Sequence, residues 1–267
     1  IQYGKYIKTK YIVSLHEVCD HSNPDFDHPN KVLKYLFSNK VPIILFSDKS
    51  TEDIKKYKGA VEENLYRVNF GQFDSFKIFQ GEKHLDLPSH YVLFIGRFTP
   101  YKGLRLFYEA TKELASKGYH FVVAGSGNDE AIEDLKRIPN FTIINRYLSN
   151  RDFVELVERS SFIVCPYTSM SQSGIPQTAF VFNKPIIATD LDGFKEIIQN
   201  GRNGLLFSSN NKLELSEYIN LLIENNSYLN ELIEGVGMFE KLFPKYSWKE
   251  ITETYIKDFI TCQEHYS

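Results

Sequence analysis

Six short apolar segments between Tyr91 and Phe207 alternate with turns and amphipathic segments, and this alternation limits the possible folds more than any other feature of the chain. The apolar segments are residues 91–95, 120–124, 141–144, 162–165, 185–189 and 204–207. Strands that are apolar on both faces and alternate with helices are typical of a parallel sheet covered on both sides. We therefore expect an α/β fold with a doubly wound sheet.

Helical patterns connect these strands. Residues 104–116 place Leu104, Phe107, Thr111 and Leu114 on one side, and Gly118 follows as a stop signal. Ser149 and Asp152 have the spacing of a capping box. Helices are also predicted at residues 129–137, 150–159, 175–182, 194–199, 212–224, 228–242 and 248–260.

The first part of the chain shows the same alternation over a shorter length. Strands are predicted at residues 10–15, 41–46 and 66–69, helices at 31–37 and 51–58, and a loop at 20–30. Residues 80–89 are polar and contain Gly81 and Pro88, which indicates an interdomain linker. We expect a partial first domain at residues 1–85, a second domain at 86–245 and a final helical segment at 246–267.

The composition narrows the classes of function. A net charge of −3 gives no basic surface for nucleic acid, and no apolar run reaches the roughly 18 residues of a membrane span. The three cysteines, Cys19, Cys165 and Cys262, form no close pair, so we expect no disulfide framework. These features favour a cytoplasmic protein. The chain begins with Ile1, and we expect that a longer protein contains a segment upstream of it.

Cationic and glycine-rich turns follow several of the predicted strands. Gly96 and Gly103 bracket Arg97 and Lys102 after the strand at 91–95. Ligands of doubly wound sheets bind at the carboxyl ends of the strands. Arginine binds phosphate oxygens bidentately, and lysine adds a point charge. We interpret Arg97 and Lys102 as a phosphate-binding pair; the alternative is two solvated charges on a surface turn.

Three further features at this edge each have a structural alternative. The Gly125-Ser126-Gly127 segment favours either close approach to a ligand or a tight turn. Ser173 and Gly174 offer backbone amides to an anion, or Ser173 caps its own helix. Glu196 follows Asp190 and Asp192, and it either binds sugar or ribose hydroxyls or is an exposed acid.

Histidines in the first part of the chain are further candidates for a functional role. His16 ends the first predicted strand, where an imidazole could orient a substrate, although a lone histidine is more often structural. His21, His28 and the aspartates between residues 20 and 27 match no spacing of metal ligands, so we predict no metal site.

The order and spacing of these motifs resemble the retaining glycosyltransferases of family 4. The resemblance is carried by residues 94–97 with 102–104, 123–127, 165–167 and 184–190, and by Gly193, Glu196 and residues 200–205. It implies the GT-B architecture, in which two Rossmann-like domains face a cleft and the second domain binds most of a nucleotide-sugar donor. The segment after Trp248 resembles the family's last helix, which crosses back to the first domain. No metal or other cofactor is implied.

The resemblance also implies roles for individual residues. Arg97 and Lys102 would hold the donor diphosphate, and Gly96, Gly125 and Gly127 would line the nucleotide site. Residues 145–148, with Tyr147, would cover the base. His16 resembles a histidine close to the transferred sugar. The family's N-terminal glycine-rich loop has no counterpart, so the first domain is expected to be only partly present.

One departure from the family concerns its paired glutamates. Most members carry two of them eight positions apart, and Met170 and Thr178 occupy those positions here. Residues 171–176 instead resemble a Gln-Ser-Gly variant found in enzymes that build bacterial surface polysaccharides. Amides of Ser173 and Gly174 could still bind phosphate, whereas sugar and ribose contacts must come from elsewhere or be absent.

These observations predict a retaining glycosyltransferase that moves a sugar from a nucleotide diphospho-sugar, with UDP favoured, to a glycan or lipid-linked acceptor. With a lipid-linked acceptor, we expect peripheral contact with the inner face of the membrane. One alternative is a sugar-nucleotide epimerase of the same fold, which needs no acceptor. The other is a non-catalytic nucleotide-binding subunit, which Met170 and Thr178 suggest.

Overall fold

The chain forms two compact units in the computed structural model, which describes residues 11–16, 18, 31–170 and 172–265. Unit 1 consists of Ile1–Gly71 and Phe243–Ser267, and unit 2 of Gln72–Leu242. These units begin and end at other residues than the expected domains at 1–85, 86–245 and 246–267. The loop predicted at residues 20–30 lies outside the described residues.

Unit 2 contains a parallel sheet in the order β6-β5-β4-β7-β8-β9. Its strands are β4 (Val92–Ile95), β5 (Phe121–Gly125), β6 (Phe141–Asn145), β7 (Phe162–Cys165), β8 (Ile186–Thr189) and β9 (Gly204–Phe207). The strand order reverses between β4 and β7, and a crevice forms at the carboxyl ends of strands at such a point. The predicted doubly wound sheet is confirmed.

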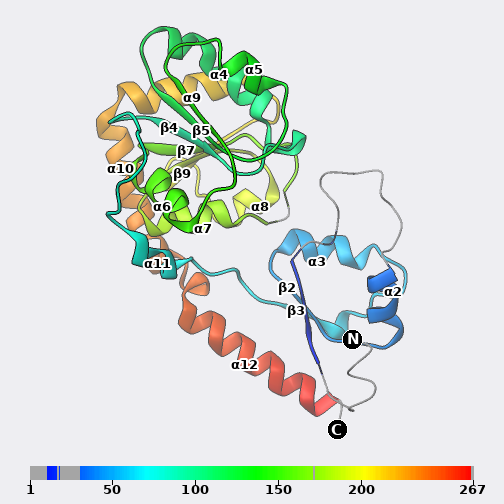
Figure 1. Cartoon of the computed structure of the whole chain (residues 1–267). Helices are drawn as coiled ribbons and strands as arrows, with labels where there is room; N and C mark the ends of the chain where they lie inside the picture. The colour runs from blue at the N-terminus through cyan, green and yellow to red at the C-terminus, as the bar shows by residue number, and fades with distance from the viewer. Residues whose placement is uncertain (1–10, 17, 19–30, 171, 266–267) are drawn as a thin grey trace. The chain divides into compact units, whose positions relative to one another are not determined.

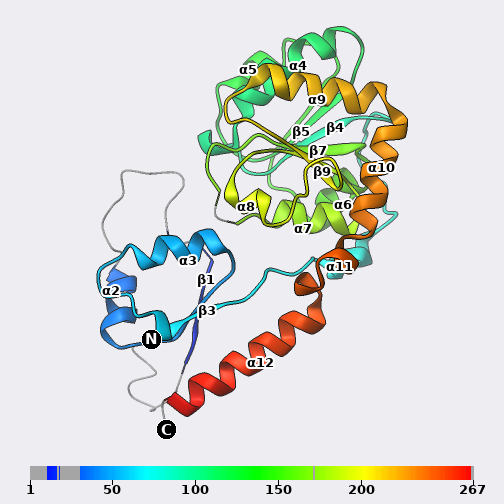
Figure 2. The ribbon, with the colours of Figure 1, turned by 180° about the vertical axis from the view of Figure 1, so that it is seen from behind.

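Helices cover both faces of this sheet (Figures 1 and 2). One face carries α4 (Leu104–Ser116), α5 (Ala131–Leu135) and α9 (Lys212–Glu224), and the other carries α6 (Asn150–Arg159), α7 (Gly174–Val181) and α8 (Asp192–Lys195). Phe107 of α4 packs its ring 5.4 Å from that of Phe94 and 5.9 Å from that of Phe121. Burying such a side chain contributes about 1.5–3 kcal/mol. This packed core supports the turns at the sheet edge.

Some helix bounds differ from the prediction. The helix predicted at 228–242 is divided at Met238 into α10 (Asn226–Gly237) and α11 (Phe239–Leu242). Near the end of α10, Gly235 packs on the carbonyl of Arg202, and a Cβ atom at this position would overlap the carbonyl oxygen. The helical turn predicted at 194–199 is α8, which begins at Asp192 and ends at Lys195. None of the 3₁₀ helices in the described residues was predicted; in unit 2 these are η2 (Asp74–Phe79) and η3 (Pro100–Lys102).

The segment at residues 80–89, expected to be a linker, is instead bound to α6 within unit 2. The amide of Gly81 donates to Glu158 at 2.8 Å, and the amide of His84 donates to Glu155 at 2.9 Å. Arg159 of α6 donates to the carbonyls of Leu85 and Leu87 at 3.1 and 3.2 Å. The linker interpretation was wrong because the partners of this polar backbone are side chains far along the sequence.

Unit 1 contains a parallel sheet of β1 (Val13–Leu15), β2 (Ile43–Leu45) and β3 (Leu65–Arg67), in that order. The helices α2 (Lys31–Ser38) and α3 (Asp48–Lys55) bury Leu36 and Ile54 in a cluster with Ile43 and Leu45. Ile251 of α12 (Trp248–His265) is buried in a second cluster with Ile44, Phe46 and Val68. The 3₁₀ helices η1 (Glu62–Asn64) and η4 (Pro244–Tyr246) complete the elements. None of the helices in the described residues is long and apolar enough to cross a membrane.

Candidate functional site

The turns after β4 and β5 run side by side at the carboxyl edge of the sheet in unit 2. The Gly96 amide donates to the carbonyl of Ala124 at 3.0 Å, and the Phe98 amide donates to that of Ser126 at 2.9 Å. A Cβ atom on Gly125 would overlap the carbonyl oxygen of Gly96, and one on Gly127 would lie 2.6 Å from that of Phe98. Contact between the two turns therefore explains both glycines without a ligand. Their predicted place in the nucleotide site stays a prediction.

The turn after β6 is joined to the same edge. Asn145 exchanges two hydrogen bonds with the backbone of Gly127, at 3.3 and 3.2 Å, and the Arg146 amide donates to Gly125 at 2.7 Å. Tyr147 is 84% exposed. The segment at residues 145–148, predicted to cover the nucleotide base, thus lies directly beside the turn that contains Gly125 and Gly127.

Asp152 fixes this segment to the start of α6. Its two carboxylate oxygens accept hydrogen bonds from the guanidinium of Arg146, both at 2.8 Å, and the capping box with Ser149 is present as predicted. His84 Nε2 lies 3.1 Å from the same carboxylate. The bonds from Arg146, then those from Ser149 and His84, hold the pKa of Asp152 far below its ordinary value although burial opposes this. The carboxylate is therefore ionised at neutral pH.

The turns after β4 and β7 meet where the strand order reverses. The Thr168 amide donates to the carbonyl of Tyr101 at 2.8 Å. Gly103 has a φ of +73°, and a Cβ atom there would overlap the carbonyl oxygen of Pro166. Arg97 is exposed, and Lys102 is half-buried at the end of η3. Both cations of the predicted phosphate-binding pair therefore lie at the carboxyl edge, at the point where ligands of such sheets bind.

An aromatic ring positions the lysine of this pair. Lys102 Nζ lies 3.7 Å from the centre of the Tyr167 ring and 5.0 Å from that of the Tyr101 ring. The face of an aromatic ring attracts a cation at this range. Tyr167 is buried, and burial raises the pKa of its hydroxyl well above the ordinary value, so the ring stays neutral.

The helix α7 follows the turn after β7. Ser173 caps this helix, because its hydroxyl accepts a hydrogen bond from the Ile175 amide at 3.3 Å. The structural alternative for Ser173 is thus observed. A role for the Ser173 and Gly174 amides in binding an anion stays a prediction, and it is compatible with the positive end of the helix dipole.

The two positions at which the family carries glutamates present no polar group for a ligand. Met170 is apolar and buried, and the Thr178 hydroxyl donates to the carbonyl of Gly174 at 3.0 Å within α7. Glu196 is half-buried and follows α8, while Asp190 pairs with Lys195 at 2.9 Å. A role for Glu196 in binding sugar or ribose stays a prediction.

A set of buried polar atoms at this edge was not identified from the sequence. Within the described residues, the buried side-chain nitrogen and oxygen atoms that lack a hydrogen-bond partner belong to Thr99, Tyr167, Gln172, Gln177 and Thr189. All of these residues lie in the turns after β4 and β7, in the first turn of α7 or at the end of β8. An unpaired buried polar group costs about 1–3 kcal/mol, which a polar ligand can offset. The set is compatible with a polar ligand at this edge. Tyr167, Gln172 and Thr189 lie in segments that carry the family resemblance, but no sequence pattern marks their polar atoms as unpaired.

Two other side chains are relevant to catalysis. Burial raises the pKa of the Cys165 thiol to about 12, so this residue is no thiolate nucleophile. His16 lies in unit 1, directly after β1, and its ring stacks on that of Phe46 with centroids 4.7 Å apart. Its role beside the transferred sugar stays a prediction. His21 and His28 lie outside the described residues.

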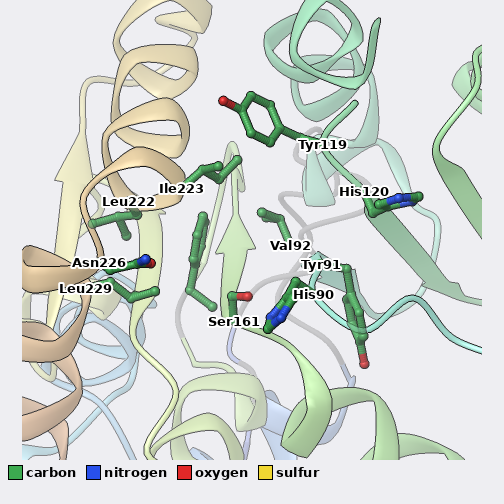
Figure 3. A pocket seen from close by; sticks show the side chains of 11 residues that line it. His90, Tyr91, Val92, Tyr119, His120, Ser161, Leu222, Ile223, Asn226 and Leu229 are labelled. Carbon is green, nitrogen blue, oxygen red and sulfur yellow. The ribbon is translucent and has the colours of Figure 1, made fainter. Parts of the chain in front are cut away.

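A pocket of about 230 Å³ lies at the opposite edge of the same sheet (Figure 3). It is lined by residues that precede β4, β5 and β7, namely His90, His120 and Ser161, and by Ile223 and Asn226 at the junction of α9 and α10. Because parallel strands place their carboxyl ends at one edge, this pocket is separate from the phosphate-binding candidates.

Comparison with known proteins identifies the family. Residues 89–225, just over half of the chain, match the family described as "Glycosyl transferases group 1". The chain belongs to this family.

Relatives of this group 1 glycosyl transferase include an uncharacterized protein and one with a named activity. An uncharacterized glycosyltransferase of Methanocaldococcus jannaschii, MJ1178, is 32% identical over 166 residues, which are 59% of this chain and 44% of the relative. The N,N'-diacetylbacillosaminyl-diphospho-undecaprenol alpha-1,3-N-acetylgalactosaminyltransferase of Campylobacter jejuni is 31% identical over 138 residues, or 50% of this chain and 35% of the relative. The chain thus covers about half or less of the length of these relatives.

Solved structures confirm the fold of this group 1 glycosyl transferase. Anabaena HepE in complex with UDP and glucose has a TM-score of 0.70 at 15% identity and covers 96% of this chain and 73% of its own. TarM has a TM-score of 0.69 at 21% identity and covers 91% of this chain and 49% of its own. These neighbours are GT-B glycosyltransferases, so the expected GT-B architecture is confirmed.

Proposed function

We propose that this group 1 glycosyl transferase is a retaining enzyme of the family 4 type, with UDP as the nucleotide of its sugar donor. The observation that carries the proposal is the position of Arg97 and Lys102 in the turn after β4, at the reversal of strand order, where the ring of Tyr167 lies 3.7 Å from Lys102 Nζ. This arrangement is suited to a diphosphate, because a bidentate cation and a point charge both favour phosphate oxygens.

The chemistry follows from where negative charge develops. The bond between the sugar C1 and the diphosphate oxygen breaks, and both electrons leave with the diphosphate. An acceptor hydroxyl bonds to C1 from the same face, and its proton passes to the departing diphosphate oxygen. Arg97 and Lys102 stabilise the departing diphosphate, which is an electrostatic contribution made without a metal ion.

Named relatives support the donor and acceptor classes. HepE was solved with UDP and glucose, and the Campylobacter jejuni relative is named for transfer to a diphospho-undecaprenol. A Staphylococcus aureus relative, CapM, is named for capsular polysaccharide biosynthesis and is 23% identical over 234 residues. We accordingly propose a glycan or lipid-linked acceptor in bacterial surface polysaccharide synthesis. For a lipid-linked acceptor, we propose that the enzyme works in the cytoplasm at the inner face of the membrane.

Calorimetric titration with UDP and GDP tests the donor site. The parent chain and its Lys102→Ala variant are titrated without added metal. Saturable binding of one nucleotide that is lost in the variant supports the proposal and identifies the base. Equal binding by parent and variant contradicts the assignment of Lys102 to the diphosphate.

One observation favours a second candidate, a non-catalytic nucleotide-binding subunit. Met170 and the internally bonded Thr178 remove both carboxylates expected of the family. The full-length protein, supplied with several donors and acceptors, distinguishes the two functions. Nucleotide binding without sugar transfer would favour the subunit.

A further inference from the structure

The pocket at the amino edge of the sheet in unit 2 has an apolar floor (Figure 3). Val92, Phe162 and Leu222 line it, are at most 2% exposed and belong to the core cluster of this unit. Ile223 and Leu229 are half-buried, pack against the same cluster and extend the apolar lining. A group that enters this pocket therefore contacts the carbon atoms of a packed core.

Polar side chains line the same pocket, among them those of His90, Tyr119, Ser161 and Asn226. In Figure 3, Asn226 lies on the side of α10, across the pocket from His90 and Ser161. None of these four side chains forms a hydrogen bond or ion pair with another described residue. Their hydroxyl, amide and imidazole groups can therefore bond to a ligand without breaking a contact within the protein.

Charged side chains are missing from the described residues that line the pocket, since none of them is Asp, Glu, Lys or Arg. A carboxylate or phosphate would lose hydration here without gaining a guanidinium or ammonium partner. A purely apolar ring would leave the polar side chains without hydrogen bonds. An uncharged ring that carries hydroxyl groups satisfies both conditions, because its C–H groups pack on the floor and each hydroxyl both donates and accepts.

We propose that this pocket binds a neutral sugar ring, either a free sugar or one unit of a glycan. Its volume of about 230 Å³ is below the roughly 300–1,000 Å³ of pockets for drug-sized ligands, so it suits one ring rather than a nucleotide sugar.

The pocket is separated from the proposed donor site by the length of a strand. β4 has four residues, and at about 3.3 Å per residue it places the turn with Arg97 and Lys102 roughly 13 Å from the pocket. A sugar in the pocket is therefore not the sugar that is transferred. This site goes beyond the proposed function, because binding at it needs no nucleotide.

Titration of the chain with defined sugars tests the site. Methyl glycosides of glucose, galactose and N-acetylglucosamine represent free sugars, and maltotriose, galactotriose and chitotriose represent the matching glycans. Changes in protein NMR signals are followed at about pH 8, where free imidazole carries little charge. We expect saturable binding of a neutral sugar and weaker binding of glucuronic and galacturonic acid. Tighter binding of the trisaccharide identifies a glycan unit as the ligand, and equal binding identifies a free sugar.

Two substitutions each remove one polar group from the pocket, Asn226→Leu and Ser161→Ala. Loss of one hydrogen bond is expected to weaken sugar binding roughly two- to tenfold. Asn230→Leu is the matched control, because Asn230 lies one turn further along α10, is exposed and does not line the pocket. It is expected to keep the affinity of the parent. Thermal melting verifies that each variant is folded, and Ser161→Ala provides the readout if Asn226→Leu fails to fold.

Nucleotide titrations of the same samples separate the pocket from the donor site. Asn226→Leu is expected to bind UDP or GDP like the parent, and Lys102→Ala is expected to bind the sugar like the parent. Loss of sugar binding in Lys102→Ala, or unchanged sugar binding in both pocket variants, would place the sugar elsewhere and overturn the inference.

Two further results would also overturn it. These are a parent that binds none of the neutral sugars, and uronic acids that bind as tightly as the neutral sugars. A parent that binds a nucleotide but no sugar leaves the donor site standing. A parent that binds a sugar in the pocket but neither nucleotide supports the pocket assignment, and the proposed function then fails alone.

Discussion

Lys102 Nζ lies 3.7 Å from the centre of the Tyr167 ring, so a cation from the turn after β4 rests on an aromatic ring from the turn after β7. These two turns flank the point at which the strand order reverses. A charge held in place before a ligand binds stabilises developing negative charge without reorganisation. The contact therefore holds the Lys102 charge at the reversal of strand order, where the proposed diphosphate would bind.

Removing the Tyr167 ring is expected to weaken nucleotide binding, whereas removing its hydroxyl is not. Tyr167→Leu eliminates the ring face and is expected to cost about 0.5–2 kcal/mol of binding free energy. Tyr167→Phe keeps the face and serves as the matched control. Calorimetric titration of both variants with the nucleotide gives the comparison. Equal affinity of the two variants would show that the ring does not position Lys102.

Gly103→Ala is expected to separate the turns after β4 and β7. The new Cβ atom would overlap the carbonyl oxygen of Pro166, and the φ of +73° adds strain of about 1–3 kcal/mol. Gly118→Ala is the control, because its φ of +101° causes similar strain but no atom lies within 4 Å. Urea denaturation is expected to show a larger loss of stability for Gly103→Ala. If both variants lose the same unfolding free energy, the overlap with Pro166 adds nothing to the cost of the strained φ.

Asp152→Asn is expected to destabilise the protein in a pH-dependent way. The folded-state pKa of Asp152 is lowered from 3.8, so its ionised form contributes stability above that pH and loses it as the pH falls toward the folded value. We expect a loss of about 2 kcal/mol at pH 7 that shrinks below pH 3.8. Denaturation at several pH values measures it.

A surface ion pair provides the control for Asp152. Glu133 pairs with Lys136 at 2.7 Å, and both side chains are more than half exposed. Glu133→Gln is expected to change the free energy of unfolding by less than about 1 kcal/mol. If Asp152→Asn behaves in the same way at all pH values, its bonds to Arg146 do not stabilise the fold.

The sequence predicted those elements whose signals are local. The strands β7 and β9 and the helices α4 and α9 have the predicted bounds, because apolar runs and a 3.6-residue period are properties of neighbouring residues. The capping box of Ser149 and Asp152 was predictable for the same reason. Arg97 and Lys102 could be proposed as site residues because their turn follows a recognisable strand.

Features that depend on distant parts of the chain could not be predicted. Gly125 looked equally suited to a ligand or a turn, because the atom that forbids a side chain there belongs to Gly96. Residues 80–89 looked like a linker because their partners include Glu155 on α6. The unpaired Oε1 of Gln177 is a consequence of tertiary burial, and no sequence pattern marks it.

Nucleotide binding is expected to be independent of divalent metal. Arg97 and Lys102 provide two positive charges at the proposed diphosphate site, and the start of α7 adds a partial positive charge, so a bound cation is not needed for neutralisation. Titrations in EDTA and in excess Mg²⁺ are expected to give the same affinity. In Lys102→Ala, excess Mg²⁺ is expected to restore part of the lost affinity, because the cation then replaces the missing charge. Binding by the parent that EDTA abolishes and Mg²⁺ restores would contradict the assignment of the diphosphate to these side chains.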